Sequence, residues 1–247
     1  MEFEKLQEMI DKRKSVRKYT GEPVDDATVQ KILDFIADTK PLYPDIRVCS
    51  EIVGRESVKS ILPWLPPQIL SIYSEDKDGA PENIGFIYQQ LDLYLQSIGL
   101  GACWVGMCKP DEKKGGARES ADGLKFVMMI AFGYPKGNGR RKSVSEFKRK
   151  SLFDISDRAD DRLRPAALAP SSINSQPWYF VHEGDTIHVY CVQQGLLKKK
   201  VVSGINLLDT GIALAHLYVS YPDAFRFFRA DAPTQVKNYQ YVGSLNL

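Results

Sequence analysis

The sequence predicts a mixed helix-and-strand fold for this chain of 247 residues. The strongest helix signal covers residues 82–98, where apolar residues recur at steps of three and four. Two apolar runs, 102–105 and 125–132, are typical of buried strands. Residues 179–190 hold two short alternating runs around Glu183-Gly184-Asp185, a pattern that indicates a hairpin. Helices and strands are therefore expected in both halves of the chain.

The remaining elements are predicted in chain order from the same periodicities. Residues 3–10 have helical spacing, and Asp25 or Asp26 can cap a second helix over 29–36. Residues 68–73 favour a short strand after a proline-rich loop, and Gly99 should end the helix that covers 82–98. The second half should contain a short helix at 162–168, a strand from Trp178, an apolar helix near 207–218 and a last strand at 240–245.

Composition favours a globular protein with a small-molecule partner. Hydrophobic residues make up 43% of the chain, enough for a sizeable core, and 33 basic residues nearly balance 31 acidic ones. A formal net charge of +2 indicates no general attraction to nucleic acid or to a membrane. The sequence has no apolar run of membrane-spanning length, and its four cysteines lack CxxC spacing. The early charges of Glu2, Glu4 and Lys5 predict that there is no secretory leader. We therefore expect a cytoplasmic location and no zinc site.

The first motif is an alternation of Arg13, Ser15 and Arg17 in a polar segment near the N-terminus. Alternate side chains of an extended segment point the same way, so these three could offer charge-assisted hydrogen bonds to a phosphate and its neighbouring polyol. The alternative interpretation is a solvated basic loop, because short Lys and Arg runs are common on protein surfaces.

The second motif, Ala169-Pro-Ser-Ser-Ile-Asn-Ser-Gln-Pro-Trp178, lies between a predicted helix and a predicted strand. Its prolines restrict the backbone, while Ser171, Ser172 and Asn174 offer hydroxyl and amide groups to the polar edge of a heterocycle. Trp178 is expected to anchor the turn in the core. The alternative is an ordinary loop rich in Pro, Ser and Asn.

Together these motifs resemble the R-x-S-x-R and A-P-S-S-x-N-x-Q-P-W elements of the FMN-dependent nitroreductase family. The resemblance implies an α+β fold, with a central antiparallel sheet flanked by helices. In that family both motifs occur early in the chain, and each flavin lies between two subunits, one giving the arginines and the other the serines. Here the second motif comes late, so we expect two half-size units that form an intramolecular pseudo-dimer, a monomer with an internal pseudo-two-fold. The expected parts of this single 1–247 domain are a unit at 1–136, a crossover at 137–164 and a unit at 165–247.

The resemblance also implies where further cofactor contacts lie. Residues 99–106 lack the third glycine of a dinucleotide-binding G-x-G-x-x-G, because Trp104 stands in its place. They match instead a family segment, G-L-G-x-x-W-x-G, that passes the flavin ring closely. Arg17 is implied near the flavin pyrimidine, and Arg141, with Arg140 beside it, near the phosphate. A solvated charge run is the alternative for both of these late arginines. The complete expected cofactor-binding set is Arg13, Ser15, Arg17, Cys103, Trp104, Gly106, Met107, Arg140, Arg141, Pro170, Ser171, Ser172 and Asn174.

The function that the resemblance implies is FMN-dependent transfer of hydride from NADH or NADPH to a nitroaromatic, a quinone or a similar flat electron acceptor. No catalytic side chain and no metal are expected, because the flavin carries the chemistry. One flavin per chain is expected, since Lys40-Pro41-Leu42-Tyr43-Pro44 stands where the first half would carry the serine motif. The alternatives are a non-catalytic flavin-binding protein, such as an FMN carrier or sensor, and, more remotely, a flavin-independent oligomerising scaffold.

Overall fold

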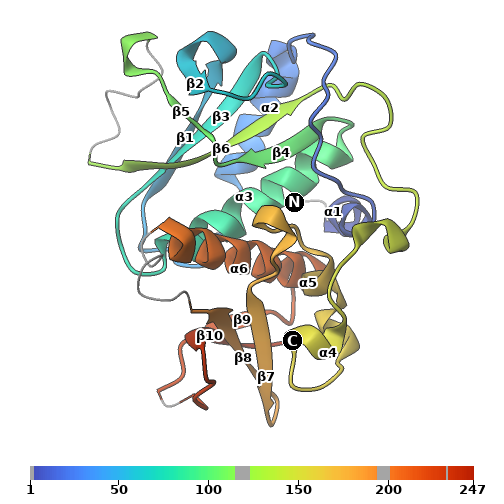
Figure 1. The fold of residues 1–247 in the computed structure, drawn as a ribbon, viewed down its shortest axis with the longest axis vertical. Helices are drawn as coiled ribbons and strands as arrows, with labels where there is room; N and C mark the ends of the chain where they lie inside the picture. Colours follow the sequence, from blue (N-terminus) through green and yellow to red (C-terminus); the bar gives the residue numbers. More distant parts are fainter. Residues whose placement is uncertain (1–2, 115–122, 194–200, 232) are drawn as a thin grey trace.

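Two antiparallel four-stranded sheets, one from each half of the chain, lie on either side of a layer of long helices (Figure 1). The structure is a computed structural model that describes residues 3–114, 123–193, 201–231 and 233–247. The predicted α+β class, with antiparallel sheets flanked by helices, is confirmed. Among the described residues, no helix combines the length and hydropathy that crossing a membrane would require.

Among its described residues, the first half contains three α-helices and six strands. They are α1 (Phe3–Ile10), α2 (Asp26–Ala37), β1 (Val48–Gly54), β2 (Val58–Ser60), β3 (Gln68–Ser74), α3 (Ala80–Ser97), β4 (Gly101–Val105), β5 (Cys108–Pro110) and β6 (Lys125–Gly133). Asp25 caps α2 by accepting a hydrogen bond from the Thr28 amide, and Gly99, at φ +89°, follows the end of α3. Both helix boundaries therefore agree with the predicted signals.

Where the structure describes the second half, it contains three α-helices and four strands. They are α4 (Leu152–Ile155), α5 (Arg164–Leu168), β7 (Trp178–Glu183), β8 (Thr186–Val192), α6 (Val201–Ser220), β9 (Arg226–Phe228) and β10 (Tyr239–Asn246). The predicted hairpin is confirmed as β7 and β8, with Gly184 at φ +59° in the turn. The apolar helix is longer than the predicted 207–218, and the last strand extends one residue beyond the prediction at each end.

The two four-stranded sheets have the same strand order. The first is β1-β3-β6-β4 and the second is β7-β8-β10-β9, so in each sheet the fourth strand along the chain lies between the second and the third. The long helix of each half, α3 or α6, connects the second strand to the third. This order agrees with two units of one plan, and the origin of those units by duplication remains a prediction.

The helices α3 and α6 approach each other closely through a reciprocal pair of glycines. A β-carbon at Gly85 would lie 2.1 Å from the carbonyl oxygen of Leu208, and one at Gly211 would lie 2.0 Å from that of Glu82. Each glycine thus meets a carbonyl three residues before the other glycine. Such reciprocity is what a two-fold contact between like units would produce, and the pseudo-dimer itself remains a prediction.

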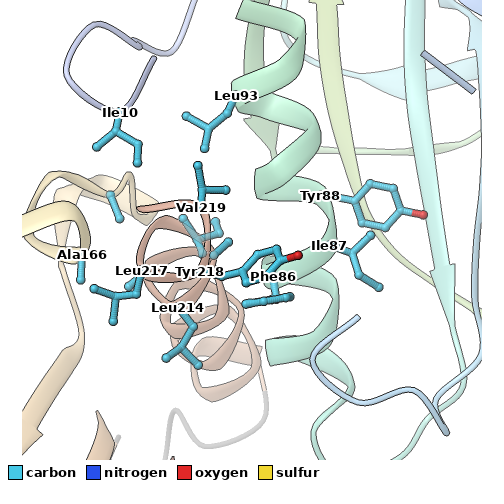
Figure 2. Packing of buried hydrophobic residues seen from close by; sticks show 14 of the residues in the cluster. Ile10, Phe86, Ile87, Tyr88, Leu93, Ala166, Leu214, Leu217, Tyr218 and Val219 are labelled. Atoms are coloured by element: carbon cyan, nitrogen blue, oxygen red, sulfur yellow. The ribbon is translucent and has the colours of Figure 1, made fainter. Parts of the chain in front are cut away.

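The main hydrophobic core surrounds this helix pair and includes α1 and α5. Leu214, Leu217 and Val219 of α6 are fully buried, and Phe86 of α3 packs against the ring of Tyr218 with centroids 5.4 Å apart. Figure 2 shows these side chains together with Ile10 and Ala166 from the flanking helices. The helix layer therefore joins both halves into one core.

The N-terminal segment after α1 runs along the outer edge of β4. The Val16 amide donates to the Ala102 carbonyl at 2.9 Å, and Ser15 forms a parallel bridge with Ala102. A β-carbon at Gly101 would lie 2.7 Å from Val16, so glycine permits this close approach. Val16 is buried and Arg17 is exposed, whereas Arg13, the first member of the predicted alternation, is buried and does not share the outward face of Arg17.

Candidate functional site

A cleft with a volume of about 340 Å³ forms where five segments that are distant in the sequence meet. The N-terminal segment contributes Ser15 and Arg17, and the end of β4 with its following turn contributes Trp104, Gly106 and Met107. The opposite side comes from the turn before β7 and from α6. The remaining residues that line the cleft are Met128, Pro170, Ser171, Ser172, Ile173, Ile205, Leu208, Asp209 and Ile212. A larger cavity of about 710 Å³ adjoins it and shares Gly106, Met128, Ile205 and Leu208.

The turn over residues 169–178, here called the serine turn, is held by its own side chains. The Gln176 amide donates to the Ser171 hydroxyl at 2.9 Å, and the buried Gln176 side chain accepts from the Lys150 amide at 2.8 Å. Trp178 is 1% exposed, so the prediction that it anchors the turn in the core is confirmed. These contacts fix the backbone that carries the two cleft-lining serines.

The serine turn also contains an unusual concentration of left-handed backbone. Ile173, Asn174 and Gln176 have φ values of 48°, 59° and 47°. For a β-branched residue such as Ile173 this conformation is strained, and strain of this kind gathers at functional sites. Ile173 is also 96% exposed at the cleft mouth, although it is a large apolar residue. Folding alone would favour a different residue here.

Arg141 and Arg149, here called the arginine cluster, lie beside the serine turn. Arg149 donates to Asn174 Oδ1 and to the Leu168 carbonyl, and both Arg149 and Arg141 contact the ring of Phe147. Burial, followed by the charges of Arg13 and Arg141, lowers the pKa of Arg149 to about 10. Arg149 Nε is buried without a hydrogen-bond partner in the described part of the chain. The cluster therefore holds positive charge that an anion would offset.

Beneath the cleft, a buried polar network connects two of its lining residues. Arg13, 1% exposed, pairs with Asp92 at 2.8 Å, and Arg13 Nη2 lies 3.4 Å from the Ser15 hydroxyl. Gln89 donates to Asp92 Oδ2 at 3.0 Å and accepts from Trp104 Nε1 at 3.1 Å. Because Arg13, Asp92 and Gln89 are buried, the network orients the partly exposed Ser15 and Trp104 from below.

Asp209 of α6 is a buried carboxyl in the cleft wall. It is 3% exposed, and its Oδ2 accepts a hydrogen bond of 2.9 Å from the Ser172 amide. Burial raises the pKa of Asp209 to about 7, and the bond from Ser172 opposes this only in part. Near neutral pH the group therefore exists in both protonation states.

The structure brings most of the sequence-predicted site residues together. Of the expected set, the cleft is lined by Ser15, Arg17, Trp104, Gly106, Met107, Pro170, Ser171 and Ser172. Asn174 instead ties the serine turn to Arg149 and to the Lys148 carbonyl.

Four other expected residues lie away from the cleft lining. Arg13 forms a buried ion pair with Asp92, and Cys103 is buried in β4, one residue before Trp104. Arg140 Nη2 donates to the Gln96 carbonyl at 2.7 Å, and Arg141 donates to the Arg13 carbonyl. These residues support the N-terminal segment and α3 rather than forming the cleft wall.

Sequence reasoning missed Arg149 and Asp209. Arg149 stands in a highly charged stretch that was interpreted as a crossover, where one arginine has no local feature to distinguish it. Asp209 did have a signal, because it is the lone acidic residue in a mostly apolar helical run from Ile205 to Leu217. A charged residue on a buried helix face is uncommon unless it has a partner or a role.

Comparisons with known proteins identify the family and the fold of the chain. Residues 5–221 match a family model described as "Putative TM nitroreductase". A structure from Thermotoga maritima MSB8, described as a "putative nitroreductase", is similar with a TM-score of 0.63 and 18% identity, over 100% of this chain and 94% of that one. At this identity the likeness shows the fold.

Two shorter matches come from Clostridium difficile. A nitroreductase family protein from strain 630 gives a TM-score of 0.46 at 16% identity, over 62% of this chain and 96% of that one. A protein of strain R20291 described as an FMN-dependent nitroreductase gives 0.42 at 16% identity, over 58% and 93%. The comparison with curated proteins gave no significant match.

Proposed function

Because the chain belongs to the nitroreductase family of the matching model, we propose that it is an FMN-dependent oxidoreductase that takes hydride from NADH or NADPH. The acceptor in this proposal is a nitroaromatic, a quinone or a similarly flat molecule. The observation that carries it is the single cleft in which Ser15 and Arg17 meet Ser171 and Ser172. A volume of about 340 Å³ is within the range of roughly 300–1,000 Å³ that is typical of small-molecule sites.

The residues present fit a phosphate-bearing flavin. The arginine cluster beside the serine turn has surplus positive charge and an unpartnered Arg149 Nε, which suits the FMN phosphate. Gly106 leaves room for a flat ring, because a β-carbon there would meet only Met128, at 3.7 Å. We propose Arg149 and Arg141 for the phosphate, and the serine turn with Ser15 for the ring and its polyol chain.

The chemistry that bound FMN supplies is two-electron transfer from the nicotinamide donor to the acceptor. Arg17 is an exposed cation on the cleft wall and would stabilise negative charge that develops beside it. Trp104 is oriented by its bond to Gln89, so this wall of the cleft is rigid. Leu208 and Ile212 of α6 make part of the opposite wall apolar, which limits water near the reacting atoms.

We propose one flavin per chain, with the pseudo-equivalent place filled by aromatic side chains. Leu42 and Tyr43 are held by Asn83 of α3 as Ser172 is held by Asp209 of α6. The Tyr43 ring packs edge-on against Phe227 at 5.7 Å and would contact a β-carbon at Gly79 at 2.8 Å. In this proposal the Tyr43 ring stands where the first half would otherwise present a loop like the serine turn.

Titration of the purified protein with FMN, followed by fluorescence quenching, tests the binding part of this proposal. We expect one FMN per chain, and a ratio of two would overturn the single-site arrangement. Anaerobic addition of NADH or NADPH should then bleach the flavin absorbance. Bleaching by dithionite but by neither nucleotide would favour a flavin carrier or sensor, whereas a colourless protein that ignores FMN would favour a scaffold.

Arg149→Ala tests the phosphate assignment. Loss of a charge-assisted hydrogen bond costs about 1.5–3 kcal/mol, so the FMN dissociation constant should rise roughly 10- to 100-fold. Arg158→Ala is the matched control, because Arg158 is exposed in the same stretch of chain. Equal affinities of the two variants would remove Arg149 from the proposed site.

A further inference from the structure

Asp209 is the one titratable acid among the described residues that line the cleft. It stands on α6 beside Leu208, with Ile205 and Ile212 on the same wall, so its surroundings are mostly apolar. Among the described residues the Ser172 amide is its one hydrogen-bond donor. A carboxylate usually gathers two or three donors when it is buried as an anion. This environment instead favours a carboxylic acid that keeps its proton until a base approaches.

The first half of the chain shows what anchoring alone would require. Asn83 on α3 comes one residue after Glu82, as Asp209 comes one residue after Leu208 in the reciprocal helix contact. Asn83 Oδ1 accepts from the amides of Leu42 and Tyr43, both at 2.9 Å. A neutral amide therefore suffices to hold a loop on the long helix. The half that lines the cleft has an ionisable acid at the matched position.

We propose that Asp209 is a general acid that donates a proton to the oxygen of the electron acceptor in the cleft. This inference rests on the proposed function. A quinone that receives a hydride becomes a hydroquinone only after one more proton, and a nitro group that receives a hydride needs one proton to release water and leave a nitroso group. In either case the O–H bond of Asp209 breaks, an O–H bond forms on the acceptor, and solvent returns a proton to the carboxylate before the next turnover. The two electrons arrive with the hydride, so none comes from the protein.

Three other charged or titratable groups surround Asp209 and must be separated from it. Arg17, on the N-terminal segment, lines the same cleft and carries a guanidinium group. Burial raises the pKa of the Cys191 thiol of β8 to about 12, with Glu82 and Asp209 adding to the shift. Burial also raises the pKa of Glu82 on α3 to about 7, so Glu82 is the group that could imitate Asp209. Glu82 does not line the cleft between Ser15 and Ser172.

Asp209→Asn keeps an oxygen for the Ser172 amide and removes the proton. The test uses FMN-loaded protein and measures two steps separately by anaerobic rapid mixing, namely flavin bleaching by NADH or NADPH and flavin reoxidation by a benzoquinone. We expect wild-type reoxidation to slow as pH rises between about 5 and 9, with a midpoint near 7. In Asp209→Asn, flavin reoxidation at about pH 5 should be at least about 100-fold slower than in wild type, and its rate should not fall further as pH rises. Flavin bleaching, which needs no proton donor, should slow far less than reoxidation.

Two controls distinguish proton donation from a structural role. Ferricyanide takes single electrons without a proton, so its rate of flavin reoxidation should be the same in wild type and Asp209→Asn. The Glu82→Gln variant should keep the wild-type pH descent with benzoquinone. Equal slowing of Asp209→Asn with both acceptors, or loss of the descent in Glu82→Gln, would overturn the assignment.

A readout independent of turnover is a carbon-13 NMR titration of the side-chain carboxyls without acceptor. The resonance absent from Asp209→Asn should titrate near the pKa of about 7, and a resonance that titrates at an ordinary aspartate pKa would refute the proposal. If instead the proposed function is wrong, neither NADH nor NADPH will bleach the flavin of the wild-type protein, which distinguishes that outcome from failure of the Asp209 assignment.

Discussion

Replacing Gly211 with alanine should destabilise the fold, because α3 and α6 touch through this residue. A β-carbon at Gly211 would lie 2.0 Å from the Glu82 carbonyl oxygen, and an ordinary contact begins at 3.4 Å. The helices would have to separate locally by roughly 1.4 Å, and a backbone carbonyl cannot turn aside as a side chain can. The same helix pair carries Asp209 and the wall of the cleft.

The magnitude follows from two opposing effects. Overpacking of this kind costs about 1–3 kcal/mol, and the upper end applies because the clash is with backbone. Alanine recovers about 1 kcal/mol of helix propensity over glycine. The expected net loss is about 2 kcal/mol, which corresponds to a fall in Tm of about 4–8 °C for a protein of this size.

Gly204→Ala is the matched control within α6. A β-carbon at Gly204 would meet nothing within 4 Å, so only the propensity gain applies, up to about 1 kcal/mol or 2–4 °C in Tm. Thermal unfolding followed by circular dichroism measures both variants. A Gly211→Ala protein as stable as wild type, or a Gly204→Ala protein that loses as much as Gly211→Ala, would refute the close helix contact.

Three further predictions concern single sites. Asp92→Asn leaves the Arg13 guanidinium buried without its counter-charge, so the free energy of unfolding measured in urea should fall by about 3–5 kcal/mol. Glu8→Gln, at the exposed pair with Lys12, should leave stability nearly unchanged. Equal effects of the two variants would contradict the buried pair. Burial raises the pKa of Asp209 to about 7, so between about pH 4 and pH 7 the unfolded chain loses a proton that the folded chain keeps, and the free energy of unfolding of wild type falls as pH rises. This fall is at most about 4 kcal/mol, and Asp209→Asn should abolish it. Parallel curves of unfolding free energy against pH for the two proteins would contradict the shift. Gly106→Val fills the cleft, so it should weaken FMN binding at nearly unchanged Tm, and undiminished affinity by fluorescence titration would exclude Gly106 from the ring site.

Local patterns were sufficient for most of the elements. The helix predicted over 82–98 and the strands at 125–132 and 240–245 were found within two residues, because their apolar periodicities are long and regular. β1 and β9 were not predicted. Every residue of β1 is only partly buried, and β9 has three residues, so neither has a strong alternation to detect.

The site residues show the same division. Alternation at 13–17 indicated side chains that face one way, and the family-like serine turn indicated a ligand edge; both segments do line one cleft. The pattern did not show that Arg13, the first member, lies below the others. Its burial depends on Asp92, a residue on another element.

The sequence by itself determined the elements, the two motifs and the family resemblance, because these depend on neighbours along the chain. The tertiary structure alone decided that Arg149 joins the cluster beside the serine turn and that Asp209 becomes a buried acid in the cleft. The physical reason is that charge pairing and desolvation depend on atoms supplied by distant segments. Those segments meet only after α3 and α6 have packed through Gly85 and Gly211.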